Sequence, residues 1–140
     1  MPDDSSLATL RAAIDAVAPP VEGRPDAPPE GVERHVVHQI ELYLPGFTDM
    51  LAALLDAFAA DVRPGAGFAE LSREERGEVF RLMAAEESQD IREAVDALFV
   101  FTLGGVYSES AAPPGQRPAV WDRVGYAGPS FGHPDYRTGA

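Results

Sequence analysis

FTDMLAALLDAFAADV, residues 47–62, is the stretch that decides the fold of this chain. Its large apolar side chains recur three and four residues apart, which is the spacing of one face of an α-helix. They form a broad stripe: Phe47, Met50, Leu51, Leu54, Leu55 and Phe58. Pro45-Gly46 precedes the stretch and Arg63-Pro64-Gly65 follows it, and proline and glycine both interrupt helices. The pattern therefore predicts a helix that packs on other helices through this stripe.

Two further helical patterns lie nearer the N-terminus. The first helix is expected to begin after Ser5 or Ser6 and to stop at Pro19-Pro20. Its apolar face consists of Leu7, Leu10, Ile14 and Val17. The second helix is expected to begin near Gly31, after a loop rich in proline and acidic residues. Its apolar residues are spaced four apart: Val32, Val36, Ile40 and Leu44.

Two more helices are predicted in the next part of the chain. Ser72 and Glu75 have the spacing of a capping box, in which each side chain accepts from the backbone N–H of the other residue. The helix after them turns Val79, Phe80, Leu82 and Met83 inward. The last helix is expected over about 89–102, with Ile91, Val95, Leu98 and Phe99 on one face and Val100 and Phe101 completing an apolar end. Gly104-Gly105 is expected to end it, because glycine commonly follows the last helical residue.

No stretch of alternating apolar and polar residues competes with these helices. The sequence therefore predicts an all-α fold, an irregular bundle of about five helices over about residues 5–103. A length of 140 residues is expected to form one domain, spanning 1–140. Residues 104–137 are predicted to follow the bundle as a long ordered coil that is rich in aromatic residues, proline and glycine.

This C-terminal coil is the most unusual part of the sequence. It holds the only tryptophan and three of the four tyrosines, whereas disordered segments are poor in aromatic residues. Tyrosine, tryptophan and arginine are enriched at the energetic centres of protein interfaces. The candidate partner-interface residues are Tyr107, Arg117, Trp121, Arg123, Tyr126, Phe131 and Tyr136. The same rings could instead cover this chain's own bundle. We expect some of them to cover the bundle and the rest to face a partner.

Composition narrows the classes of partner and of chemistry. The net charge of −12 and the sequence pI near 4.5 disfavour nucleic acids and anionic membranes, which need clusters of basic residues. The chain has no cysteine, which excludes disulfides, thiol catalysis and cysteine-ligated metals. No basic and apolar signal segment begins the chain, and no apolar run approaches the roughly 20 residues of a membrane span. We therefore expect a soluble cytoplasmic protein without a membrane span.

The one candidate metal site lies in the second predicted helix. His35 and His38 are three residues apart on one face, and Glu41 follows three residues later. Such a set could bind a divalent metal, and a stand-alone helical metal-binding protein is the alternative function. However, no glutamate lies three residues before either histidine, as di-iron bundles require, and His-Glu-x-x-His is absent. Surface histidines beside a core face are the simpler interpretation.

No other motif indicates an enzyme. The glycines do not form Gly-x-Gly-x-x-Gly between a strand and a helix, so no nucleotide-binding loop is expected. Serine catalysis needs a base, an orienting carboxylate and an oxyanion hole, and the sequence has no local signature of these. We therefore predict no catalytic residue, no cofactor and no metal in this chain, and an interaction module rather than an enzyme.

Several motifs together resemble one known family. They are LRAAIDAVAP at 10–19, GVE at 31–33, GGVYS at 104–108, RPAVW at 117–121 and GYAGP at 125–129. In this combination the chain resembles the small subunit (subunit 3, or gamma) of gluconate 2-dehydrogenase-type flavoprotein dehydrogenases. The resemblance covers nearly the whole chain, and its most specific part is the C-terminal coil.

The resemblance implies a role beside a large FAD-dependent oxidoreductase of the glucose–methanol–choline class. In that family the large subunit holds the FAD and oxidises a sugar or alcohol. The small subunit is non-catalytic and supports the folding, stability and export of the large one in a hetero-oligomer. Export relies on a twin-arginine leader, which the first residues of this sequence do not contain. A cytoplasmic complex is therefore expected, or a periplasmic one if a leader is missing from the sequence or the complex is co-exported.

Overall fold

The computed structural model describes residues 2–18, 29–108, 121 and 125. These residues form five α-helices and one short 3-10 helix, and no strand occurs among them. The elements in order are α1 (Asp4–Val17), α2 (Pro29–Tyr43), α3 (Phe47–Val62), η1 (Phe68–Glu70), α4 (Arg73–Ala84) and α5 (Gln89–Tyr107). The prediction of an all-α irregular bundle of about five helices is confirmed.

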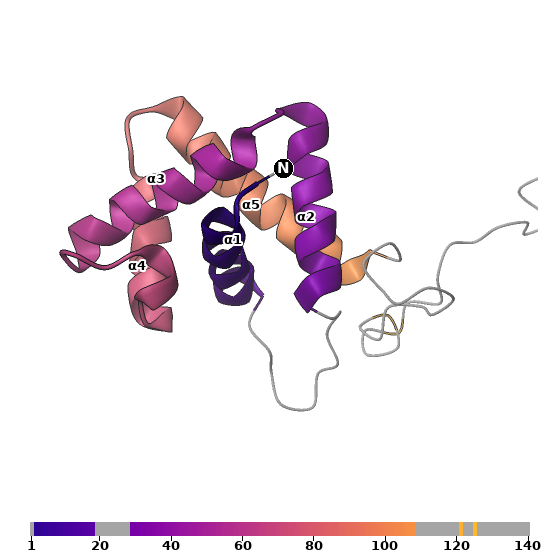
Figure 1. Ribbon diagram of the computed structural model, residues 1–140, viewed down its shortest axis with the longest axis horizontal. Coiled ribbons are helices and arrows are strands. Elements are labelled where there is room, and N and C mark those ends of the chain that lie inside the picture. The colour runs from indigo at the N-terminus through magenta and orange to yellow at the C-terminus, as the bar shows by residue number, and fades with distance from the viewer. Residues whose placement is uncertain (1, 19–28, 109–120, 122–124, 126–140) are drawn as a thin grey trace, which may run out of the picture.

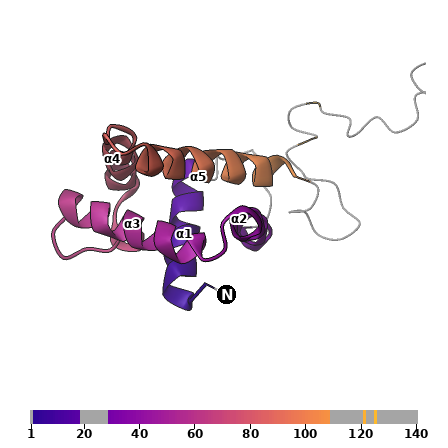
Figure 2. The same cartoon turned by 90° about the horizontal axis from the view of Figure 1, so that it is seen from above.

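Helix α1 lies at the centre of the bundle and contacts every other helix (Figure 1). Its Leu10 and Ala13 are fully buried. Asp3 caps this helix, because its carboxylate accepts a 2.7 Å hydrogen bond from the backbone N–H of Ser6. The helix therefore begins at Asp4, slightly before the expected start after Ser5 or Ser6. Figure 2 shows α5 running along one side of the molecule, with α1, α2 and α3 all on its other side.

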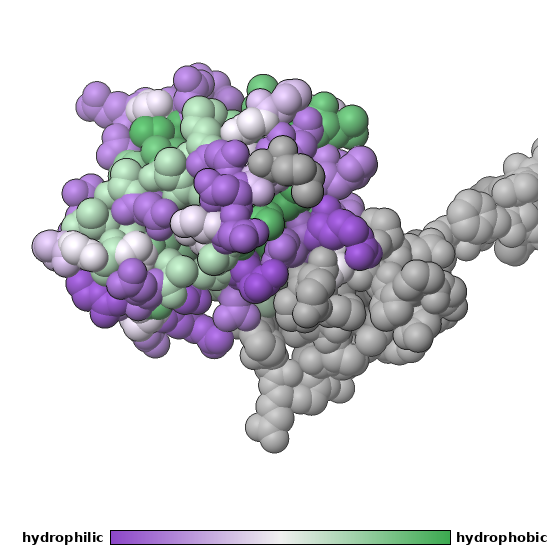
Figure 3. Space-filling view, viewed as in Figure 1, coloured by the Kyte–Doolittle hydropathy of each residue, from purple (hydrophilic) through white to green (hydrophobic). Residues whose placement is uncertain are grey.

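The apolar stripe of α3 is buried much as its spacing predicts. Leu51 and Leu55 are fully enclosed, and Phe47, Leu54 and Phe58 pack partly buried against the same core. Met50 does not, because 57% of it is exposed on the first turn of the helix. The outer face of α3 continues with exposed alanines, and Figure 3 shows this face as a pale green band.

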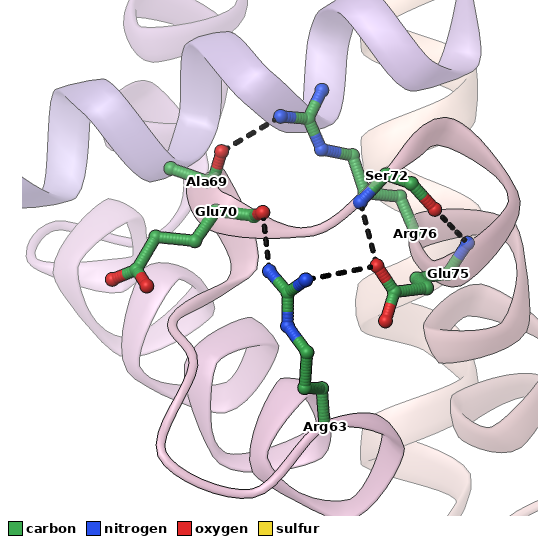
Figure 4. Close-up of polar contacts among 6 residues, drawn as sticks. All are labelled: Arg63, Ala69, Glu70, Ser72, Glu75 and Arg76. Carbon is green, nitrogen blue, oxygen red and sulfur yellow. Dashed lines mark hydrogen bonds and ion pairs between the residues drawn. The ribbon is translucent and has the colours of Figure 1, made fainter.

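The connection from α3 to α4 is closed by the predicted capping box and by two arginines (Figure 4). The N–H of Glu75 donates to Ser72 Oγ at 3.2 Å, and the N–H of Ser72 donates to Glu75 Oε1 at 2.9 Å. Arg63 donates to the carbonyl of Glu70, and Arg76 donates to that of Ala69 at 2.8 Å. These hydrogen bonds satisfy backbone N–H and carbonyl groups that have no hydrogen-bond partner within a helix.

The predicted boundary between the bundle and the coil is wrong, because helix α5 is longer than expected. It continues through Gly104-Gly105 and ends at Tyr107, so that 104–107 belong to the helix and not to a coil. A Cβ atom on Gly105 would lie only 3.1 Å from His35 Cδ2 and 3.2 Å from Val32 Cγ1. Gly105 is therefore a site of close approach between α5 and α2, and it does not stop the helix. The rest of the predicted coil, apart from residues 108, 121 and 125, lies outside the described residues.

The two adjacent glycines allow a matched test of this close approach. Gly104→Ala is expected to stabilise the fold by up to about 1 kcal/mol, because alanine is the better helix former and nothing lies within 4 Å of the added methyl group. Gly105→Ala should be less stable than Gly104→Ala by roughly 1–2 kcal/mol, because its methyl group must displace Val32 or His35. Urea unfolding of both variants measures the difference. Equal gains would show that the two helices do not need glycine where they meet.

Candidate functional site

The structure separates the three residues of the candidate metal site into different roles. His35 is half-buried beside Gly105, whereas His38 is exposed. Glu41 points to the start of α3, where its two carboxylate oxygens accept from the N–H of Gly46 at 2.7 Å and of Thr48 at 3.1 Å. In the part of the chain that the structure describes, no three His, Asp or Glu residues lie close enough to hold a metal ion.

Glu41 supplies the N-terminal cap that α3 lacks. The residue before that helix is Gly46, which adopts a left-handed backbone (φ +82°) and has no side chain to accept from the first turn. The side chain and N–H of Thr48 and the N–H of Gly46 face the carboxylate and hold the pKa of Glu41 below its usual value. This carboxylate therefore joins α2 to α3 across the tight turn at Pro45-Gly46.

Removing this cap should cost stability in a pH-dependent way. Glu41→Gln is expected to lower the free energy of unfolding at neutral pH by about 1 kcal/mol, as lost N-caps do. Because the pKa of Glu41 is lowered in the folded protein, its contribution is present above the unfolded value of about 4.5 and is lost as the pH falls through the folded pKa. Chemical unfolding at pH 7 and at pH 3 should show the difference between wild type and variant shrinking. Asp15→Asn, on the exposed face of α1, is the control and should change stability little at either pH. A loss that is equal at both pH values would show that the carboxylate does not act as the cap.

His35 is the titratable group closest to the α2–α5 contact. Burial, and then the neighbouring His38, lower the pKa of His35 below its ordinary 6.5. The fold therefore favours the neutral imidazole, and this contribution to stability is complete above about pH 6.5 and declines as the pH falls below it. This role is structural, since the ring packs on the backbone of α5 at Gly105.

Trp121 packs on this chain's own bundle. It is only 7% exposed and belongs to the same hydrophobic core as Val106. Its indole N–H donates a 2.6 Å hydrogen bond to the backbone carbonyl of Tyr107, the last residue of α5. The sequence left open whether each aromatic ring packs on this chain's own bundle or on a partner. Trp121 packs on the bundle, and its indole N–H satisfies a carbonyl at the end of α5.

Trp121 should accordingly matter for folding itself. Trp121→Ala is expected to destabilise the chain by about 3 kcal/mol through the cavity it leaves. Trp121→Phe keeps most of the ring but loses the hydrogen bond, and should cost about 1 kcal/mol. Denaturant unfolding followed by circular dichroism measures both, because neither variant keeps a tryptophan for fluorescence. Tyr107→Ala, which keeps the accepting carbonyl, is the control and should cost less than about 0.5 kcal/mol. Unchanged stability in both Trp121 variants would show that Trp121 does not stabilise the bundle, and it would again be a candidate interface residue.

The other candidate interface residues divide into two groups. Tyr107 is 47% exposed at the end of α5, so its ring is free to meet a partner. Arg117, Arg123, Tyr126, Phe131 and Tyr136 lie outside the described residues.

The structure adds a surface that the sequence interpretation missed. We define the α2–α5 surface by its large exposed apolar side chains, which are Leu42, Tyr43, Leu44, Val100, Leu103 and Tyr107. Leu44 continues the four-residue spacing of Val32, Val36 and Ile40 but is 57% exposed, and Val100 is 65% exposed. The ring of Tyr43 stacks on Phe101 with centroids 6.4 Å apart, which joins the end of α2 to α5. Figure 3 shows strongly apolar surface near the upper end of α2.

A signal for this surface was present in the sequence. Leu42, Tyr43 and Leu44 are consecutive, and successive helical residues point about 100° apart, so they cannot all face one core. Similarly, Phe99, Val100 and Phe101 are consecutive on α5, and only part of such a run can be buried. Which of these residues faces outward depends on how the helices are placed, and no local rule states it.

Comparisons with models of protein families, with curated proteins and with solved structures found no match for this chain. The resemblance to the small subunits of flavoprotein dehydrogenases therefore stays a prediction. Among the described residues no single helix is long and apolar enough to cross a membrane. Only the segments Gly31–Tyr43 and Phe47–Val62 taken together, bent by 111°, reach that length and composition.

Proposed function

We propose that this chain is the non-catalytic small subunit of a larger oxidoreductase and that the α2–α5 surface is where it meets the large subunit. The observation that carries the proposal is the presence of six large apolar side chains, each at least 44% exposed, at the end of α2 and on the outer side of α5. Exposed apolar patches mark interaction sites on soluble proteins, and the contact of Tyr43 with Phe101 brings the end of α2 next to α5.

Energetics supports an interface of useful strength. Burying a leucine, valine or phenylalanine side chain completely is worth roughly 1.5–3 kcal/mol. Because the side chains of this surface are largely exposed, much of that free energy can still be gained when a partner covers them. Tyr43 and Tyr107 add rings with a polar hydroxyl, which is a favoured composition for interface centres. The contact of Tyr43 with Phe101 restrains the tyrosine ring before binding, and restraint of this kind reduces the entropy lost on binding.

The class of partner comes from the resemblance. GGVYS at 104–108 forms the end of α5, next to Leu103 and including Tyr107 of the α2–α5 surface. RPAVW at 117–121 includes Trp121, which bonds to that same helix end. The proposal is that the large subunit is an FAD-dependent oxidoreductase of the glucose–methanol–choline class that acts on sugar or alcohol groups. This chain would bind it, stabilise it and assist its maturation, while the FAD belongs to the partner.

The proposal is tested by co-expression. The full-length chain is expressed with a neighbouring gene for a flavoprotein of this class, and the large chain is assayed for solubility and bound flavin. We expect both to fall when the small chain is omitted, and the two chains to elute together in gel filtration. Unchanged solubility and flavin content without the small chain would remove the proposal.

Surface variants locate the contact. The double variant Val100→Asp and Leu103→Asp is expected to weaken the complex by about 2 kcal/mol or more, because it buries carboxylates against the partner. Ala60→Asp on the exposed face of α3 adds a carboxylate away from this surface and should leave the affinity unchanged. Circular dichroism melting of each variant alone checks that the bundle remains folded. If the control weakens the complex as much as the double variant does, the contact lies elsewhere.

A further inference from the structure

The outer side of α5 carries a regular row of exposed side chains. Glu93, Asp96, Val100, Leu103 and Tyr107 follow one another at intervals of three, four, three and four residues, and all five are exposed. We call this row the α5 seam. Its average interval is 3.5 residues, which is the repeat by which one helix packs along another.

The α5 seam lies opposite the face by which α5 joins the bundle. The buried residues of the helix are Ala94, Val95, Leu98, Thr102, Gly105 and Val106. Helices α1, α2 and α3 all lie on that buried side, as the view from above shows (Figure 2). Helix α5 therefore has two lengthwise faces suited to packing, and its own bundle uses only one of them.

The seam is acidic at one end and apolar at the other. Glu93 and Asp96 lie beyond the first helical turn, so the helix dipole does not account for them. Within the described residues neither carboxylate is ion-paired with an arginine; Glu93 accepts only from the neutral amide of Gln89. The nearby Arg92 instead donates to the backbone carbonyls of Glu86 and Glu87.

This polarity argues against a second copy of the chain as the occupant. Two α5 helices packed in parallel would place Glu93 and Asp96 against the same residues of the other copy. An antiparallel pair centred on Val100 would place carboxylates against Leu103 and Tyr107, where they would lose water without gaining a partner. The net charge of −12 on each chain adds repulsion to both arrangements.

We infer that the α5 seam binds an amphipathic helix of the partner, with arginine or lysine residues against Glu93 and Asp96 and apolar residues against Val100, Leu103 and Tyr107. The inference rests on the proposed function in that it names the element by which the large subunit would be held. Charge complementarity at one end fixes the direction of the bound helix, and apolar burial at the other end supplies most of the affinity.

Two synthetic peptides test this directly with the full-length chain. Both are helical, about three heptads long, and share the same leucines at one end of the packing face. One carries arginine and the other carries glutamate at the positions that would meet Glu93 and Asp96. We expect fluorescence anisotropy to show the arginine peptide binding at least about tenfold more tightly than the glutamate peptide at low salt, with the preference shrinking at high salt.

Variants of the chain supply the matched controls. The charge reversal Glu93→Arg with Asp96→Arg should reverse the preference between the peptides, and Leu103→Asp should weaken the arginine peptide by about tenfold or more. Ala60→Asp on α3 should change neither the preference between the peptides nor the affinity for the arginine peptide. All four residues changed are exposed, and melting followed by circular dichroism confirms that each variant is folded.

The inference is overturned if the chain binds both peptides equally or neither of them, or if Leu103→Asp has no effect. It is also overturned if sedimentation shows a dimer of this chain that Leu103→Asp dissociates, because the occupant would then be a second copy. Failure here with a flavoprotein complex intact removes only the helix-docking inference. If the peptides bind as expected but no flavoprotein complex forms, the proposed function is removed. The α5 seam then remains a helix-binding site.

Discussion

The close approach of α2 and α5 at Gly105 is the contact on which the rest of the structure depends. With no side chain at this position, the backbone of α5 lies against Val32 and His35 of α2. This contact lies on the buried face of the C-terminal half of α5, which includes Thr102 and Val106, and the helix continues to Tyr107. It also fixes where α5 ends, and therefore where Trp121 can meet it.

Holding α5 by one face leaves its other face to solvent. Because helices α1, α2 and α4 pack on the core side of α5, the residues on its opposite side are not buried within the described part of the chain. Val100, Leu103 and Tyr107 are exposed for this reason, and not because the helix is loosely packed. The apolar surface and the acidic residues beside it are thus direct consequences of how α5 is placed, and they give the proposed partner a defined face to bind.

Glu41, the carboxylate of the candidate metal site, has the same structural role as two other carboxylates of the bundle. Asp3, Glu41 and Glu75 each accept backbone N–H groups at the start of a helix, and these hydrogen bonds lower the pKa of each of them. Backbone N–H groups at helix starts need acceptors, and these carboxylates supply them. A spacing of His35, His38 and Glu41 along one helix does not reveal this, because the acceptor role of Glu41 depends on the turn at Gly46 bringing α3 back to it.

The sequence by itself determined the local features of this protein. Helical spacing and the breaks at Pro45-Gly46 and at 63–67 placed the helices, and the capping box of Ser72 and Glu75 was readable because it involves residues only three apart. Only the tertiary structure decided which apolar residues face outward, that Gly105 is a contact rather than a stop, and that Trp121 closes the end of α5. The physical reason is that periodicity identifies a helix and its apolar residues, whereas burial depends on the direction from which other helices approach, and that direction is set by contacts between residues far apart in the chain.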